Sequence, residues 1–145
     1  MIIIDFFGFS GSGKSYSAKQ LATKNTNMNS SFLYIANQYR ILRSIKKIYY
    51  IFFASFSDLK IVLELHKLFN YKSRYNKIKN IISFLYLIGY IKSQSPKTSI
   101  LLLDHGFVQC LLSCFLFSLN KKYDLKKITQ IISKLFTCLD VYYDY

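Results

Sequence analysis

The sequence predicts a mixed α/β fold in which a short parallel β-sheet is flanked by helices. A glycine-rich stretch at residues 8–15 separates a short apolar run from a helical pattern. A second apolar run, at 100–103, ends in the carboxylate of Asp104. Helical patterns fill most of the remaining chain. Short apolar runs that alternate with helical segments are typical of parallel strands joined by crossover helices, and the 145 residues indicate one domain.

The glycine-rich stretch reads GFSGSGKS and fits G-x-x-x-x-G-K-[ST], the P-loop or Walker A motif. It follows a strand predicted over 2–7, which is rich in β-branched and aromatic residues. It precedes a helix predicted over 14–24, in which Ala18, Leu21 and Ala22 share one face. The motif therefore lies between a strand and a helix, as its mechanism requires.

The residue types of this loop suit a nucleoside triphosphate. Glycines let the backbone N–H groups approach phosphate oxygens, and the following helix directs the positive end of its dipole at them. Lys14 is expected to reach the β- and γ-phosphates, and Ser15 to be a ligand of Mg²⁺. The predicted cofactors are thus ATP and Mg²⁺; the alternative is a turn without a ligand. The residues expected to bind the nucleotide are Gly8, Ser10, Gly11, Ser12, Gly13, Lys14, Ser15 and Tyr16.

The next part of the chain is predicted to be mainly helical. After a polar loop at 25–31 and a second strand at 32–35, apolar residues recur at helical spacing over 37–50, 59–69 and 78–91. Residues 51–56 are ambiguous between helix and strand, and Ser57 with Asp58 has the composition of an N-cap. We expect these helices to cover the sheet, with a candidate cap over 51–95, or to line a pocket for an acceptor substrate.

The third strand, at 100–103, has the Walker B form, a buried parallel strand that ends in a carboxylate. Ligands of open α/β sheets bind at the carboxyl ends of the strands. Asp104 is therefore expected to hold Mg²⁺ or to take a proton from an acceptor hydroxyl, and Lys14 and Asp104 are the predicted catalytic residues. His105 is equally a candidate contact of the acceptor or a structural loop residue. Gly106 is expected to allow a sharp turn.

The remaining residues predict helices over 107–119 and 125–139, separated by a polar turn, and the start of a further strand from residue 140. In this order of elements, and in the motifs FFGFSGSGKS and LLLDHG, the chain resembles the P-loop nucleoside triphosphate hydrolase superfamily. Within it, the chain is most similar to P-loop kinases of the thymidylate kinase-like, or nucleoside monophosphate kinase-like, group.

The resemblance implies a three-layer P-loop fold with a helical insertion between the second and third strands. It also implies transfer of the γ-phosphoryl group of ATP to a small acceptor, a nucleotide or another metabolite, with Mg²⁺. Arg40 and Arg43 follow the second strand, where such enzymes often clamp an acceptor phosphate. The alternative for both is an ordinary surface position on a helix.

Three departures from the thymidylate kinase pattern favour a different acceptor. Ser10 stands where an acidic residue is usual, and Asp104-His105 stands where Asp-Arg is usual. The arginine-bearing lid of that family lies beyond residue 145. A non-catalytic or degenerate nucleotide-binding protein is therefore the alternative function, and a P-loop GTPase or ATPase a lesser one. Asp104-His105-Gly106 is one residue shorter than the Asp-x-x-Gly of GTPases.

Composition limits the remaining classes. The net charge of +13 attracts polyanions. However, most of the basic residues are lysines, and the chain is also rich in Ile, Asn and Tyr. An AT-rich coding sequence would give this composition without a selected partner, so a nucleic-acid partner is not favoured.

Three cysteines, Cys110, Cys114 and Cys138, do not form a disulfide framework and are expected to be buried small residues in a reducing compartment. With no signal peptide and no apolar run that would span a membrane, a soluble, cytoplasmic protein is expected; its oligomeric state stays open.

Overall fold

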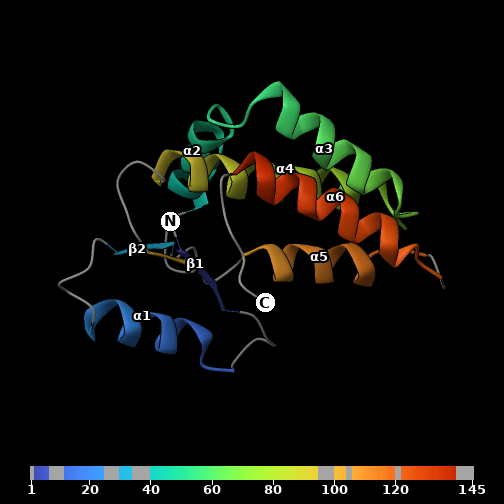
Figure 1. The fold of residues 1–145 in the computed structure, drawn as a ribbon. Coiled ribbons are helices and arrows are strands. Elements are labelled where there is room, and N and C mark those ends of the chain that lie inside the picture. Colours follow the sequence, from blue (N-terminus) through green and yellow to red (C-terminus); the bar gives the residue numbers. More distant parts are fainter. Residues whose placement is uncertain are drawn as a thin grey trace.

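The computed structural model describes residues 2–6, 12–24, 30–33, 40–94, 100–103, 106–119 and 122–139. In this part of the chain (Figure 1), the elements are β1 (Ile2–Asp5), α1 (Lys14–Lys24), β2 (Ser30–Leu33), α2 (Arg40–Ile51), α3 (Phe56–Lys67), α4 (Arg74–Gln94), β3 (Ile100–Leu103), α5 (Phe107–Leu116) and α6 (Leu125–Cys138). Most described residues are helical and the strands are parallel, so the predicted α/β class is confirmed.

The sheet is built around its third strand. β3 lies between β1 and β2 and is parallel to both. The register pairs Ile3 with Leu101 and Asp5 with Leu103, while Leu33 of β2 pairs with Leu103 from the other side. Parallel strands need crossover connections, and these contain α1 between β1 and β2 and the three helices α2, α3 and α4 between β2 and β3.

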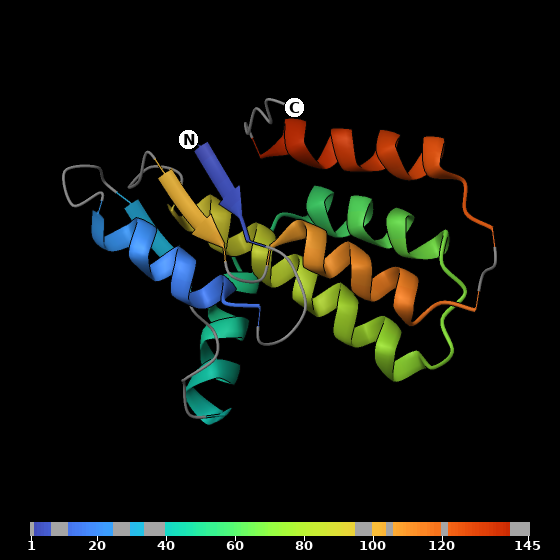
Figure 2. The ribbon, with the colours of Figure 1, turned by 90° about the horizontal axis from the view of Figure 1, so that it is seen from below.

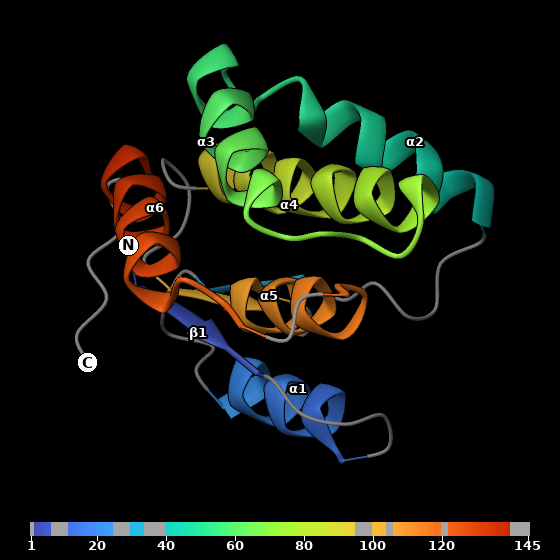
Figure 3. The same cartoon turned by 90° about the vertical axis from the view of Figure 1, so that its right-hand side faces the viewer.

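The two faces of the sheet are covered differently. Leu101 and Leu103 of β3 belong to the main hydrophobic core, which the helices α3 to α6 complete. Leu102 is equally buried and points to the opposite face, because successive side chains of a strand alternate. That face is covered by α1, whose Ala18 is fully buried. Figure 3 shows α1 on one side of the strands and the other helices on the opposite side.

The larger layer is a bundle of α3, α4, α5 and α6, which run side by side in Figure 2. Its core contains an aromatic cluster at the end away from the sheet, where the rings of Phe69, Phe115 and Tyr123 meet edge to face or tilted. Such pairs stabilise a core beyond the area they bury. None of the helices in the described ranges combines the length and the apolar character that crossing a bilayer requires.

The start of α3 differs from its prediction, because its N-cap is Ser55 and not Ser57 or Asp58. The Ser55 hydroxyl accepts the N–H of Asp58 at 3.3 Å, and the Asp58 carboxylate accepts the N–H of Ser55 at 2.7 Å. This is a capping box. Asp58 is also fully buried and forms an ion pair with Lys92 of α4 at 2.6 Å. The N3 residue of this capping box, Asp58, and not its N-cap therefore carries the charge that joins α3 to α4.

Further predicted boundaries differ from the structure, among them those of β2, α4 and α5. β2 covers 30–33 and not 32–35, because its pairing with the four residues of β3 begins at Ser30. α4 begins at Arg74 and not at 78, since the helical hydrogen bonds continue into the polar residues and Lys77 donates to the Ser73 carbonyl. α5 ends at Leu116, three residues early, because Ser118 pairs with Tyr71 in a β-bridge. The strand predicted from residue 140 lies outside the described residues.

α2 and α4 approach each other closely at Gly89, which is buried in the middle of α4. A Cβ atom at Gly89 would overlap the carbonyl oxygen of Tyr50 near the end of α2. Edge-to-face contacts of Tyr50 with Tyr86 and Tyr90 flank this point. A glycine in a helix interior costs about 1 kcal/mol relative to alanine, and here it permits backbone-to-backbone contact of the two helices.

We expect Gly89→Ala to destabilise the protein by about 1–3 kcal/mol, because the new methyl group must push α2 away from α4. The free energy of unfolding from urea denaturation checks this. Lys79→Ala, at an exposed position of the same helix, is the control and should change stability by less than about 0.5 kcal/mol. A Gly89→Ala protein as stable as the wild type would contradict the close packing.

Candidate functional site

The strands β1 and β3 end side by side, directly before the two sequence segments that carry the predicted site. Asp5 pairs with Leu103, the last residue of β3. Phe6 continues the pairing, since its N–H donates to the carbonyl of Leu103 at 2.9 Å. The glycine-rich stretch starts two residues after Phe6, and Asp104 directly follows Leu103. Both segments therefore follow strands whose carboxyl ends lie next to each other, at the same edge of the sheet.

The end of the glycine-rich stretch is the beginning of α1. Gly13 has a φ of +81°, a left-handed conformation that favours glycine, and a Cβ there would meet no atom within 4 Å. Its carbonyl accepts the N–H of Ser17 at 2.9 Å and so starts the helix. Ser12 and Gly13 are exposed, and Lys14 and Ser15 form the first turn, half-buried. An open backbone at a helix N-terminus is the arrangement that binds phosphate groups.

Several predicted site residues are only partly placed by the structure. Gly8, Ser10, Gly11, Asp104 and His105 lie outside the described residues. Tyr16 is exposed on α1, and its hydroxyl accepts a hydrogen bond from Gln20. Arg40 and Arg43 belong to the first turn of α2, but their side chains lie outside the described part. For these two arginines the backbone placement in a helix is consistent with either of the roles considered for them.

Asp5 is a residue that sequence reasoning missed. It ends β1, and its carboxylate accepts the N–H of Val108 in the first turn of α5 at 3.0 Å. A carboxylate at a helix N-terminus is stabilised by the open N–H groups and by the helix dipole. The first turn of α1, in contrast, contains no acidic residue. The available signal was an aspartate in a strand, where this residue is rare.

Gly106 has a role different from the predicted sharp turn. It is the N-cap of α5 and has an extended conformation, with φ −100° and ψ −156°, that other residues also adopt. What requires a glycine is close approach, because a Cβ at Gly106 would overlap the carboxylate of Asp5. Gly106 thus gives Asp5 access to the N-terminus of α5.

A second group of reactive side chains lies inside the helical bundle, away from the sheet edge. His66 and Cys114 are both fully buried, with 3.8 Å between the imidazole Nε2 and the thiol sulfur. The His66 Nδ1 lies 2.8 Å from the carbonyl of Val62, so Nδ1 is the protonated nitrogen and donates to it. Asn80 approaches the sulfur from the other side, and the ring of Tyr71 stacks on the imidazole.

The complete burial of both side chains argues against a catalytic thiol and base at this position. Burial lowers the pKa of His66 to about 4 and raises the pKa of Cys114 to about 11, so both groups are neutral at pH 7. An inert, neutral thiol is not a nucleophile. Among the described residues, no three His, Cys, Asp or Glu side chains gather as a metal site would require. Cys110 is half-buried and Cys114 buried, as expected, but Cys138 is exposed near the end of α6, so the prediction of burial was wrong for it. Its helix face points outward there.

Comparisons of the chain with models of protein families, with curated proteins and with solved structures found no match.

We expect Gly106→Ala to destabilise the protein by about 1–2 kcal/mol, because the methyl group displaces the Asp5 carboxylate and the Val108 N–H loses its acceptor. The same substitution in an Asp5→Ala background should cost measurably less, since no carboxylate remains to be displaced. A double-mutant cycle of unfolding free energies measures this coupling. Equal costs in the two backgrounds would show that Gly106 does not act through Asp5.

His66 should make the protein less stable in mild acid. The unfolded chain takes up a proton near pH 6.5, whereas the buried imidazole does so only near pH 4, so stability is full above about pH 6.5 and falls as the pH drops toward 4. The loss attributable to His66 should reach about 3 kcal/mol. The unfolding free energies of wild type and His66→Gln are measured at pH 7 and 4.5. The loss due to His66 is the amount by which the fall between these pH values is larger in the wild type.

The imidazole resonances provide an independent measurement that does not depend on the variant folding. His66 should remain neutral down to about pH 4 in the folded protein. Titration near pH 6.5, or identical pH dependence of stability in both proteins, would contradict the buried placement of this ring.

Proposed function

We propose that the protein binds a nucleoside triphosphate with Mg²⁺ at the edge where β1 and β3 end, and transfers the γ-phosphoryl group to a small acceptor. The observation that supports this most strongly is the in-register pairing of the two strands that precede the glycine-rich stretch and Asp104. A phosphate loop and a metal-associated carboxylate must lie next to each other to act on one phosphate chain. These two segments are almost one hundred residues apart in sequence.

The residues at the start of α1 fit a phosphate group. The positive φ of Gly13, the open space around it and the exposed backbone at Ser12 leave room for phosphate oxygens to approach the N–H groups. Lys14 adds a positive charge in the same turn of α1, and none of the residues of that turn is acidic. We propose that Lys14 binds the β- and γ-phosphates and that Ser15 and Asp104 hold Mg²⁺. The metal, when bound, neutralises charge on the phosphate oxygens.

The arrangement of the elements supports the proposed P-loop kinase fold. The strand before the loop lies directly beside the strand that ends at Asp104, and three helices are inserted between β2 and β3. We propose that Arg40 and Arg43, together with His105, contact the acceptor. Positioning and electrostatic stabilisation account for most of the rate of phosphoryl transfer, so these contacts would serve to hold the acceptor hydroxyl or phosphate in line.

We expect Mg²⁺–ATP to bind the wild-type protein and to bind Lys14→Ala at least about tenfold more weakly, because a charge-assisted contact with the phosphates is lost. Isothermal titration calorimetry measures both affinities. Lys122→Ala is the matched control, since it removes an exposed lysine from the turn before α6. Equal affinities of wild type and Lys14→Ala would overturn the proposed site, and absence of binding in a folded wild-type protein would do the same.

Turnover distinguishes a kinase from a non-catalytic nucleotide-binding protein. ADP formation that depends on one of a panel of nucleotide and sugar acceptors supports phosphoryl transfer to a small molecule. Binding of ATP without any acceptor-dependent ADP formation would instead identify the chain as a nucleotide-binding protein only. Preference for GTP, with hydrolysis in the absence of an acceptor, would point to the GTPase class.

A further inference from the structure

We propose that the protein docks on anionic membrane surfaces through an apolar corner formed by the end of α2 and the start of α3. This corner consists of exposed apolar side chains from both helices and the turn between them: Ile45, Ile48, Tyr49, Phe52, Phe53 and Phe56. The inference concerns a different part of the molecule from the strand edge, and it holds whether or not the protein binds a nucleotide.

The face that α2 presents to solvent is apolar, whereas an ordinary surface helix presents a polar one. Ile45, Ile48, Tyr49 and Phe52 follow one another at the spacing of a single helical face. The opposite face, with Tyr50 and Ile51, already packs on α4 and the core. Phe52 is 83% exposed and Phe56 79%. An apolar face of α2 is therefore exposed to solvent and is not covered by the rest of the protein.

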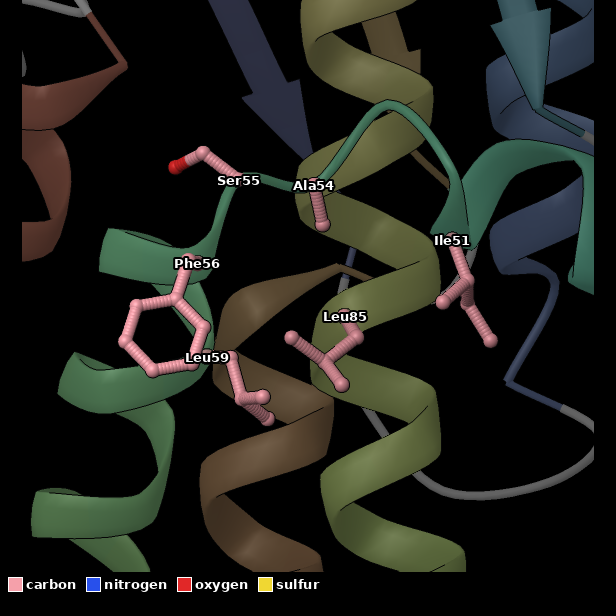
Figure 4. A pocket seen from close by; sticks show the side chains of 6 residues that line it. All are labelled: Ile51, Ala54, Ser55, Phe56, Leu59 and Leu85. Carbon is pink, nitrogen blue, oxygen red and sulfur yellow. The ribbon is translucent and has the colours of Figure 1, made fainter.

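Ring contacts among its own side chains fix part of the apolar corner. Tyr49 contacts Phe53 and Tyr50 edge to face, with ring centroids 5.3 and 5.1 Å apart. Behind Phe56, an apolar pocket of about 260 Å³ opens where α2, α3 and α4 meet, lined among others by Leu59 and Leu85 (Figure 4). Large exposed apolar patches of this kind, here next to an apolar pocket, mark interaction sites on protein surfaces.

The charges around this corner select the partner. The segment 44–57 contains two lysines, Lys46 and Lys47, and no acidic residue, and the Lys47 ammonium lies over the ring of Tyr86 on α4. Lys46 is exposed on α2, and Lys60 is exposed one turn after Phe56 on α3. A helix with basic residues beside an apolar face of Ile, Tyr and Phe is the pattern of helices that lie in the interface of anionic bilayers. Aromatic side chains are suited to the headgroup level.

A second copy of the chain fits this corner less well than a membrane does. A symmetric dimer would bring the same lysines of two copies together, each copy carrying a net charge of +13. An anionic bilayer supplies both the opposite charge and the apolar volume. α2 and α3 lie on the side of the molecule opposite α1 in Figures 1 and 3, so a bilayer at the corner leaves α1 accessible.

Tryptophan fluorescence provides the first test, because the chain has no tryptophan of its own. Phe52→Trp should show a blue shift of its emission with vesicles that contain about 30% phosphatidylserine in phosphatidylcholine, and a much smaller one with phosphatidylcholine alone. Leu116→Trp is the control, since Leu116 is 72% exposed on α5, away from the corner. No shift of Phe52→Trp, or an equal shift of Leu116→Trp, would overturn the proposal.

Sedimentation with the same vesicles separates insertion from simple charge attraction. Ile48→Ser/Phe52→Ser should lower the partition coefficient at least about tenfold, whereas Leu112→Ser/Leu116→Ser, which removes two exposed apolar side chains of α5, should change it less than about twofold. Circular dichroism verifies that both variants are folded. Equal effects of the two variants would overturn the proposal, as would a dimer in analytical ultracentrifugation that only Ile48→Ser/Phe52→Ser abolishes.

Discussion

The in-register pairing of β1 with β3 is the constraint on which the rest of the structure depends. It makes β3 the central strand, so that Leu101 and Leu103 enter the helical core while Leu102 is buried on the side of α1. It also makes the two strands end together, with the Phe6 N–H on the Leu103 carbonyl. A shift of the register by one residue would turn every side chain of a strand to the other face. Core packing therefore fixes the same alignment that makes β1 and β3 end side by side.

The helices α1 and α5, which follow β1 and β3 in the chain, differ in the acidic side chains at their N-termini. Asp5 occupies the N-terminus of α5, through the space that Gly106 leaves, and α1 begins with Gly13 and Lys14 and no acidic side chain in its first turn. The dipole of α5 is thus compensated by a carboxylate of the protein itself. On the side of the molecule opposite α1, α2 contacts the core through Tyr50 and the close approach at Gly89, and an apolar face of the same helix is exposed.

Patterns with a local physical cause could be predicted from the sequence. Residues 14–24 and Ile100–Leu103 were predicted with the correct bounds, because a glycine before a helix and a short apolar run are local signals. β2 was predicted two residues late, since its position depends on pairing with β3 and not on its own hydrophobicity. Asp5, Gly89 and the pair of His66 and Cys114 depend on contacts between distant segments, and no local pattern reports such contacts. The roles of Lys14, Ser15 and Asp104 remain predictions.

The most direct test of the central claim is to map Mg²⁺–ATP on the protein by backbone amide NMR. If the edge of β1 and β3 binds the nucleotide, the saturable changes in ¹H–¹⁵N chemical shift should be largest at residues 8–16 and 104–106. Amides of α6, on the far side of the bundle, should change little. Changes confined to the lysine-bearing face of α6, or spread evenly over the basic surface, would contradict the account and indicate that ATP is bound only as a polyanion.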